Sequence, residues 1–125
     1  MKGGDKMIFD LSPNEQIIMD YFWERNEWLS GANMWEYFNK IGKAYDRSTV
    51  NTYLARMTDK GLLKKDKRKY IHAFTKEQLA QKKAEYILDT MYDGSLSNFL
   101  SALGGSKYID VSENEELKEY LKNIE

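Results

Sequence analysis

The sequence has 125 residues and a formal net charge of −1, with 42% hydrophobic and 14% aromatic residues, no cysteine, one histidine and one proline. This length and apolar content indicate one compact domain, or one domain with an appendage, and exclude wholesale disorder. The lack of cysteine excludes disulfides, iron–sulfur clusters, cysteine zinc sites and thiol catalysis, and a single histidine argues against a histidine metal site or a catalytic triad.

The N-terminal segment predicts no export signal. Residues 1–9 contain Gly and Lys without periodicity, so we expect a flexible lead-in without the apolar core of a signal peptide. No apolar run in the chain is long enough to span a bilayer. We therefore expect a cytoplasmic protein without membrane insertion.

Residues 13–26 predict the first helix. Ser12 can cap its free amides, Pro13 fits the first helical position, and Glu15 completes a capping box. Apolar side chains then recur at helical spacing: Ile18, Met19, Tyr21, Phe22 and Trp23.

A short strand at Trp28–Leu29 and a second helix come next. Ser30 is a suitable N-cap for this helix, and Gly42 supplies its stop. Between them an apolar stripe has the i, i+3, i+4, i+7 spacing: Met34, Tyr37, Phe38 and Ile41.

The third helix is expected to begin near Asp46 or Ser48, either of which can cap it, and to end before Gly61. Its inward face is predicted to carry Val50, Leu54 and Met57. At about 100° per residue, the outer and flanking faces then carry the following side chains. They are Ser48, Asn51, Thr52, Ala55, Arg56 and Asp59.

Two β-prone runs follow the third helix. Leu62–Leu63 and Tyr70–Phe74 flank the polar residues 64–69, which predicts a β-hairpin whose turn lacks glycine. The order helix, short helix, helix, hairpin is that of a winged helix-turn-helix. The fold expected is therefore mainly α-helical with a small β-hairpin, and the winged domain spans residues 10–74.

The charges are sorted along the chain. Residues 40–70 contain ten Lys and Arg against three Asp, a net +7, while the remaining residues sum to −8. This basic block coincides with the expected recognition helix and wing, which is the electrostatic footprint of a phosphate-binding surface.

Several residues of this block suit contacts with double-stranded DNA. Asn pairs well with adenine and Arg with guanine, while basic residues at the wing tip reach phosphates or a minor groove. Taken singly, polar helix faces and charged turns are usually just solvated, so the hypothesis depends on their combination with the fold. The candidates are Lys43, Tyr45, Arg47, Ser48, Thr49, Asn51, Thr52, Arg56, Lys67, Arg68 and Lys69.

Residues 75–125 predict a helical dimerisation region. Thr75 and Gln78 form a second capping box, Asp93–Gly94 and Gly104–Gly105 end two helices, and Ser112 is expected to cap a last one. Short helices are marginal in water alone, so their apolar stripes need either a second copy of the chain or the chain's own winged domain. We favour the second copy. The expected dimer contacts are Ile87, Leu88, Met91, Leu96, Phe99, Leu100, Leu103, Leu117, Tyr120, Leu121 and Ile124.

Three stretches of the sequence, together spanning most of residues 11–124, resemble the penicillinase-repressor family. They are Leu11–Glu24, the segment from Ser48 to Leu63, and Gly94–Ser97 with the acidic end around Glu115–Leu121. The resemblance implies a homodimeric transcriptional repressor on a palindromic operator. The chain departs from the family pattern at Gln16, where Trp is frequent, and in a wing without Gly.

The resemblance also bears on regulation. In copper-responsive relatives the switch is a cysteine-rich tail, which this chain lacks. In penicillinase-type relatives a membrane sensor-protease system leads to a cut at an Asn–Phe bond, and Asn98–Phe99 lies in a similar place. Its ordinary interpretation is a polar residue beside a packed aromatic. His72, on an expected strand, is interpreted as structural.

Other classes of function are weighed against the same residues. An enzyme is not expected, because no phosphate-binding loop, nucleophile elbow or metal-ligand cluster is present, and no cofactor is implied. A winged helix used for protein contact would not need the basic block. A regulator of the multidrug-resistance type, controlled by a small ligand, remains an alternative.

Overall fold

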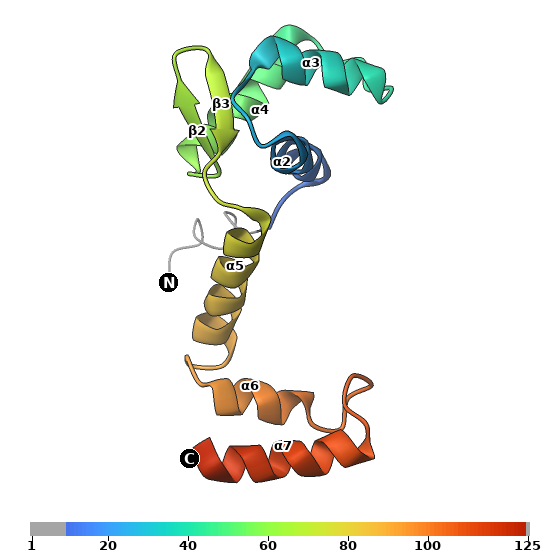
Figure 1. Ribbon diagram of the computed structural model, residues 1–125, viewed down its shortest axis with the longest axis vertical. Helices are drawn as coiled ribbons and strands as arrows, with labels where there is room; N and C mark the ends of the chain where they lie inside the picture. The colour runs from blue at the N-terminus through green and yellow to red at the C-terminus, as the bar shows by residue number, and fades with distance from the viewer. Residues whose placement is uncertain (1–9, 125) are drawn as a thin grey trace. The chain divides into compact units, whose positions relative to one another are not determined.

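The computed structural model describes residues 10–124, apart from the side chains of residues 111 and 124. The expected lead-in over residues 1–9 and the side chain of Ile124 therefore lie outside the described residues. The chain is mainly helical with a small antiparallel sheet, which confirms the predicted fold class (Figure 1). In order, the elements are α2 (Pro13–Arg25), β1 (Leu29–Ser30), α3 (Gly31–Lys40), α4 (Arg47–Asp59), β2 (Leu63–Asp66), β3 (Lys69–His72), α5 (Lys76–Met91), α6 (Leu96–Leu103) and α7 (Val111–Ile124).

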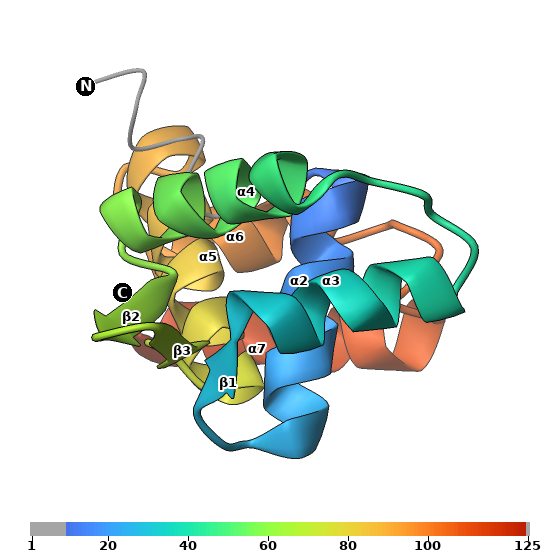
Figure 2. The ribbon, with the colours of Figure 1, turned by 90° about the horizontal axis from the view of Figure 1, so that it is seen from above.

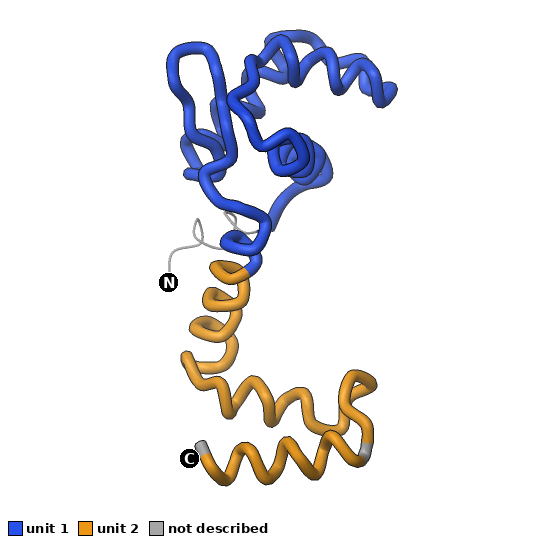
Figure 3. The backbone as a smooth tube through the Cα atoms, in the orientation of Figure 1, with its two compact units in different colours: residues 1–80 blue, residues 81–125 orange. Residues whose placement is uncertain are grey.

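The chain divides into two compact units, residues 1–80 and residues 81–125 (Figure 3). The division falls within α5, so this helix contributes its first residues to one unit and the rest to the other. In the part of the chain that is described, no helix is both long and apolar enough to cross a membrane.

The start of α2 has the predicted capping box. Ser12 Oγ accepts a hydrogen bond from the Glu15 amide at 3.3 Å, and a Glu15 carboxylate oxygen accepts one from the Ser12 amide at 2.9 Å. The helix ends one residue earlier than expected, because Asn26 adopts a left-handed conformation with φ 50°. Asn26 Oδ1 lies 2.8 Å from His72 Nε2, which gives the histidine a structural partner.

The core of the N-terminal unit lies among α2, α3 and α4, with further side chains from the sheet and from the start of α5. In Figure 2, α3 and α4 lie next to each other and α2 runs across them. The predicted inward side chains of α4, Val50, Leu54 and Met57, have no exposed surface. The largest fully buried rings are Phe22 of α2 and Phe38 of α3, so each helix contributes its apolar stripe to one shared core.

The sheet has the strand order β1–β3–β2, all antiparallel. The predicted six-residue polar tip is wrong: the strands extend through residues 63–66 and 69–72, and only Lys67 and Arg68 remain in the turn. The lysines of residues 64–66 can lie in a strand because their long aliphatic stems tolerate either face, so backbone pairing continues through these polar residues. Lys67 has φ 56°, a left-handed value usually taken by glycine in two-residue hairpin turns. The short first strand is also displaced, to Leu29–Ser30.

The C-terminal unit is built from the second half of α5 with α6 and α7. The Tyr92 and Phe99 rings meet edge to face at 5.3 Å, and the Gly105 amide donates to Asn114 Oδ1 at 3.1 Å. The last helix is capped by Asp110, whose carboxylate accepts from the Glu113 amide at 2.8 Å, so the expected Ser112 cap is wrong. No side chain described between residues 81 and 123 is buried.

Candidate nucleic-acid interface

The buried stripe of α4 turns its other face outward. Ser48, Asn51, Thr52, Ala55 and Arg56 are all exposed, as the helical spacing predicts. Thr52 donates its hydroxyl proton to the Ser48 carbonyl at 2.9 Å, so its methyl group and the acceptor side of its oxygen remain for a ligand. The face therefore offers an amide, a guanidinium and small side chains in a rigid helix.

The start of α3 approaches this outward face closely. Gly31 is buried, and a Cβ atom there would lie 2.7 Å from Asn51 Oδ1. A larger residue at position 31 would displace the Asn51 side chain. Glycine thus lets the first turn of α3 and the middle of α4 form one continuous wall.

That wall and the wing enclose a groove of about 550 Å³. Its lining includes three cations, Arg47, Lys65 and Arg68, and no carboxylate. Tyr70 forms part of its floor, with Lys65 Nζ 5.4 Å from the ring centre. The remaining lining residues are Ser30, Gly31, Ala32, Asn51 and Ala55. A concave surface of this charge suits an anionic, base-bearing polymer.

The loop before α4 is held by aromatic packing. The Trp35 indole donates to the Tyr45 carbonyl at 2.8 Å, and the Arg47 guanidinium lies 5.7 Å from the centre of the Trp35 ring. The Tyr45 hydroxyl accepts a hydrogen bond from Asn14 at 3.0 Å. Of the two predicted N-caps of α4, Asp46 holds the position. It does so through its extended backbone, because its side chain makes no capping hydrogen bond.

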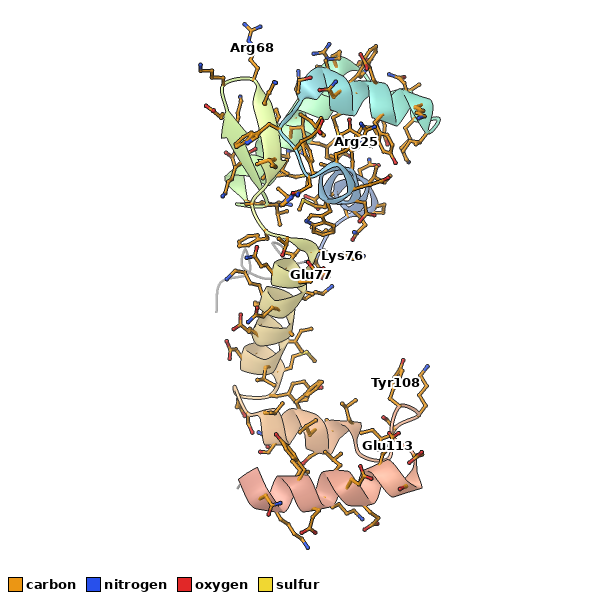
Figure 4. All side chains as sticks on the ribbon, in the orientation of Figure 1. Arg25, Arg68, Lys76, Glu77, Tyr108 and Glu113 are labelled. Atoms are coloured by element: carbon orange, nitrogen blue, oxygen red, sulfur yellow. The ribbon has the colours of Figure 1, made fainter. Side chains whose placement is uncertain are left out.

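The wing tip carries its own exposed cations. Lys67, Arg68 and Lys69 are all exposed, and Arg68 projects outward from the tip of the hairpin (Figure 4). Arg68 also lines the groove beside α4, whereas Lys67 and Lys69 do not. At the tip, Arg68 therefore contributes to the groove, while Lys67 and Lys69 flank Arg68 outside the groove lining.

One cation of the basic block has a structural role. Lys60 Nζ lies 2.7 Å from a carboxylate oxygen of Glu15, which is only 7% exposed. Burial acts to raise the pKa of Glu15, but the hydrogen bond and charge of Lys60, together with the hydrogen bonds from Ser12, lower that pKa below its ordinary value. Lys60 thus joins the end of α4 to the start of α2.

The structure brings only part of the predicted site together. Arg47, Asn51 and Arg68 line one groove, whereas the other candidates lie outside its lining: Lys43, Tyr45, Ser48, Thr49, Thr52, Arg56, Lys67 and Lys69. Thr49, Lys43 and Tyr45 are half-buried.

Sequence reasoning missed the groove residues Ser30, Gly31, Ala32, Lys65 and Tyr70 as site residues. The predicted cap at Ser30 was a usable signal, because a helix start offers free amides to phosphates. Lys65 could also have been identified, because strand alternation places Lys64 and Lys65 on opposite faces of the hairpin, so only one of them can point toward α4.

Comparison with known proteins agrees with this arrangement. The penicillinase repressor family model matches residues 11–123, which cover both units and every element from α2 to most of α7. No curated protein matches the chain. A match over nearly the whole length, with a winged helix bearing a basic groove, shows that the chain belongs to the penicillinase repressor family of DNA-binding transcriptional regulators.

Proposed function

We propose that the protein represses transcription as a homodimer bound to a palindromic operator, with α4 of each copy in a major groove and each wing against the neighbouring backbone. The observation that carries this proposal is the groove between α4 and the wing. Arg47, Lys65 and Arg68 line it without a carboxylate, so a phosphate backbone finds attraction along its length.

In this arrangement the outward face of α4 supplies the base contacts. Asn51 would pair with an adenine and Arg56 with a guanine, since each side chain matches two hydrogen-bonding atoms on those bases. Ala55 and the Thr52 methyl group would meet thymine methyl groups. Arg47, Lys67 and Lys69, at the ends of this surface, would contact phosphates and fix the register.

The C-terminal unit supports a dimer. Its helices leave an apolar groove of about 310 Å³ whose lining includes Ile87, Leu88, Leu96 and Phe99. Met91 is 70% exposed and Tyr120 is 46% exposed, although such side chains are usually covered. A second copy would cover these surfaces and present two winged helices to half-sites about 34–36 Å apart.

The proposal is tested by fluorescence anisotropy with DNA from the protein's own promoter, at several salt concentrations. Specific binding to a dyad sequence should weaken steeply as salt rises, because displaced counterions return to the DNA. A flat salt dependence, or equal affinity for scrambled DNA, would contradict the proposal and favour a protein-contact role.

Two substitutions separate base contacts from phosphate contacts. Arg56→Ala should weaken operator binding and relax the preference at one base pair, a loss of about 1–3 kcal/mol. Lys67→Ala should weaken binding to all sequences and reduce the salt slope by about 0.9. Lys122→Ala, an exposed lysine of the C-terminal unit, is the matched control and should change neither. Equal effects of Arg56→Ala on all sequences would make Arg56 a phosphate contact.

Induction by a membrane sensor-protease system is a further part of the proposal. The Asn98–Phe99 bond lies in the first turn of α6, where the Asn98 amide donates to Ser95 Oγ at 3.1 Å. A protease needs an extended substrate, so this turn would have to open before a cut. Mass spectrometry of the repressor after induction tests this, and an intact chain or a cut elsewhere contradicts it.

A further inference from the structure

The three tryptophans of the chain differ in what their indole N–H groups do. Trp23 donates to the Phe74 carbonyl at 2.9 Å, and Trp35 donates to the Tyr45 carbonyl at 2.8 Å. Trp28 is 42% exposed, and its N–H has no hydrogen-bond partner among the described residues. Two tryptophans therefore donate within the fold, while the third has a donor that the described residues do not use.

Trp28 does not line the groove beside α4 but a different surface of the wing. It directly precedes Leu29, which pairs with Tyr70, and both of these side chains are buried. Lys69 alternates with Tyr70 along β3 and so points to the other face. Trp28, just before β1, shares a hollow with Lys69 and its strand partner Asp66. The wing is thus accessible on two sides, one with the groove and one with Trp28.

A second hollow, of about 470 Å³, lies on this other side. Its lining consists of Trp28, the two turn residues Lys67 and Arg68, and the strand ends Asp66 and Lys69. Three cations against one carboxylate give it a net positive charge. Arg68 lines both hollows, so the tip of the wing separates two basic concavities.

We propose that Trp28 is a DNA-contacting residue, and that the hollow it forms with the wing tip holds a sugar–phosphate segment of the operator. This proposal rests on the proposed function. The indole N–H donates to a phosphate oxygen, the ring packs on a deoxyribose, and Lys67 and Lys69 supply the attracting charge. The wing then lies between two backbone strands, one on each face.

The charge of the hollow selects this occupant. An apolar protein segment would leave three cations desolvated without partners, at a high cost in free energy. A phosphodiester segment satisfies both the cations and the indole donor. An aromatic ring with one polar edge is suited to a surface that is apolar on the sugar and anionic on the phosphate.

The first test compares Trp28→Phe with the unchanged protein by operator anisotropy. Phenylalanine keeps a ring in place but removes the donor, so affinity should fall roughly tenfold, the loss expected for one hydrogen bond to a charged group. The salt slope should stay unchanged, because no cation is lost, whereas Lys67→Ala reduces it. The melting temperature should stay within a degree or so, since the N–H makes no bond within the fold.

A matched control is Tyr108→Phe, which removes a polar group from an aromatic ring that is 74% exposed in the C-terminal unit. It should bind the operator as tightly as the unchanged protein. Tryptophan emission provides the second readout. Operator DNA should change the emission of the unchanged protein, and this change should largely disappear in Trp28→Phe.

The outcomes separate this proposal from the proposed function. If the unchanged protein binds its operator with a steep salt dependence but Trp28→Phe binds equally well, the assignment of Trp28 is wrong and the repressor function stands. A tenfold loss that comes with a lower melting temperature and an unaltered emission change would also overturn it, as a structural effect. If the unchanged protein binds no DNA, the proposed function itself fails.

Discussion

The two units of the chain use similar apolar patterns with different results. In the N-terminal unit, fourteen hydrophobic side chains are buried among residues 10–80, from Ile18 to Leu79. In the C-terminal unit, α6 carries Leu96, Phe99, Leu100 and Leu103 at helical spacing, yet no side chain described between residues 81 and 123 is buried. An amphipathic pattern therefore predicts that a face will be covered, but not whether the same chain covers it.

The largest difference in stability is expected between two variants that each truncate one phenylalanine, one in each unit. Phe38→Ala should lower the free energy of unfolding by about 3–5 kcal/mol, because Phe38 is completely buried and its removal leaves a cavity. Phe99→Ala should cost far less at low protein concentration, because Phe99 is only partly buried in a single chain. Urea denaturation of both variants at several protein concentrations measures the difference. Equal losses at every concentration would show that the two units are stabilised alike.

Phe99→Arg is expected to separate the two copies of the proposed dimer. A charged side chain in the apolar groove beside Ile87 and Leu88 cannot be buried without a large desolvation cost. Analytical ultracentrifugation should find monomers, and operator affinity should fall about 100-fold or more, because two linked half-site contacts become one. Lys122→Ala is the control. A monomer that keeps full operator affinity would refute the dimer on the operator.

The local chemistry of helix starts made the helices predictable. The capping boxes at Ser12 and Thr75 use residues three positions apart, and both occur as expected. The extent of the wing strands was not predictable in this way, because Lys64–Asp66 pair with β3, and β3 in turn pairs with the distant Leu29–Ser30. Such long-range pairing leaves little signal in the sequence near the turn.

The candidate site shows the same division. Asn51 was predictable from the period of one helix, Arg47 from its charge at the helix start, and Arg68 from the charge of the turn. Ser30 and Lys65 join them only because α3, α4 and the sheet pack together, which brings residues far apart in sequence to one groove. Periodicity identifies the face of a helix but not the neighbouring surfaces that complete a concavity.

The Glu15–Lys60 ion pair makes the stability of the N-terminal unit depend on pH. The folded-state pKa of Glu15 lies below its ordinary value of 4.5, so its stabilising effect is fully present above that pH. It is lost as the pH falls through the folded-state pKa. Thermal unfolding of Glu15→Gln should therefore differ from the unchanged protein by about 1 kcal/mol at pH 7 and by less at the acidic end.

Glu24→Gln, an exposed carboxylate of the same helix, is the control for this pH experiment. It should leave both the melting temperature and its pH dependence nearly unchanged. A pH profile of Glu15→Gln that runs parallel to that of the unchanged protein down to acidic pH would contradict the assigned shift. The C-terminal unit has no such buried pair among its described residues, so its helix content should follow protein concentration rather than this titration.

Lys67→Gly should have opposite effects on stability and on DNA binding. Glycine relieves the left-handed backbone at φ 56°, which should raise stability by about 0.5–1 kcal/mol. It also removes a cation from the wing, so affinity for any DNA should fall and the salt slope should decrease by about 0.9. Calorimetry and anisotropy on the same sample measure the two effects, and a lower melting temperature would show that the lysine stem packs on the wing.

The smallest expected change in stability comes from Gly31→Ala. The added methyl group would overlap the end of the Asn51 side chain, which can rotate away, and would make an ordinary contact with Leu54. The free energy of unfolding should therefore change by less than about 0.5 kcal/mol. The displaced amide should nevertheless alter the base preferred opposite Asn51. Selection of binding sites from a random DNA library measures this, and an unchanged preference would remove Asn51 from base recognition.

Between residues 81 and 123 none of the described side chains is buried, which affects how long a single chain survives. Helices that gain little from their own packing open often, and proteases act on the opened form. If the chain dimerises as proposed, newly made single chains at low concentration should be degraded faster than paired chains. The lifetime of the repressor would then rise with its abundance, so a cell that dilutes the protein also shortens its survival.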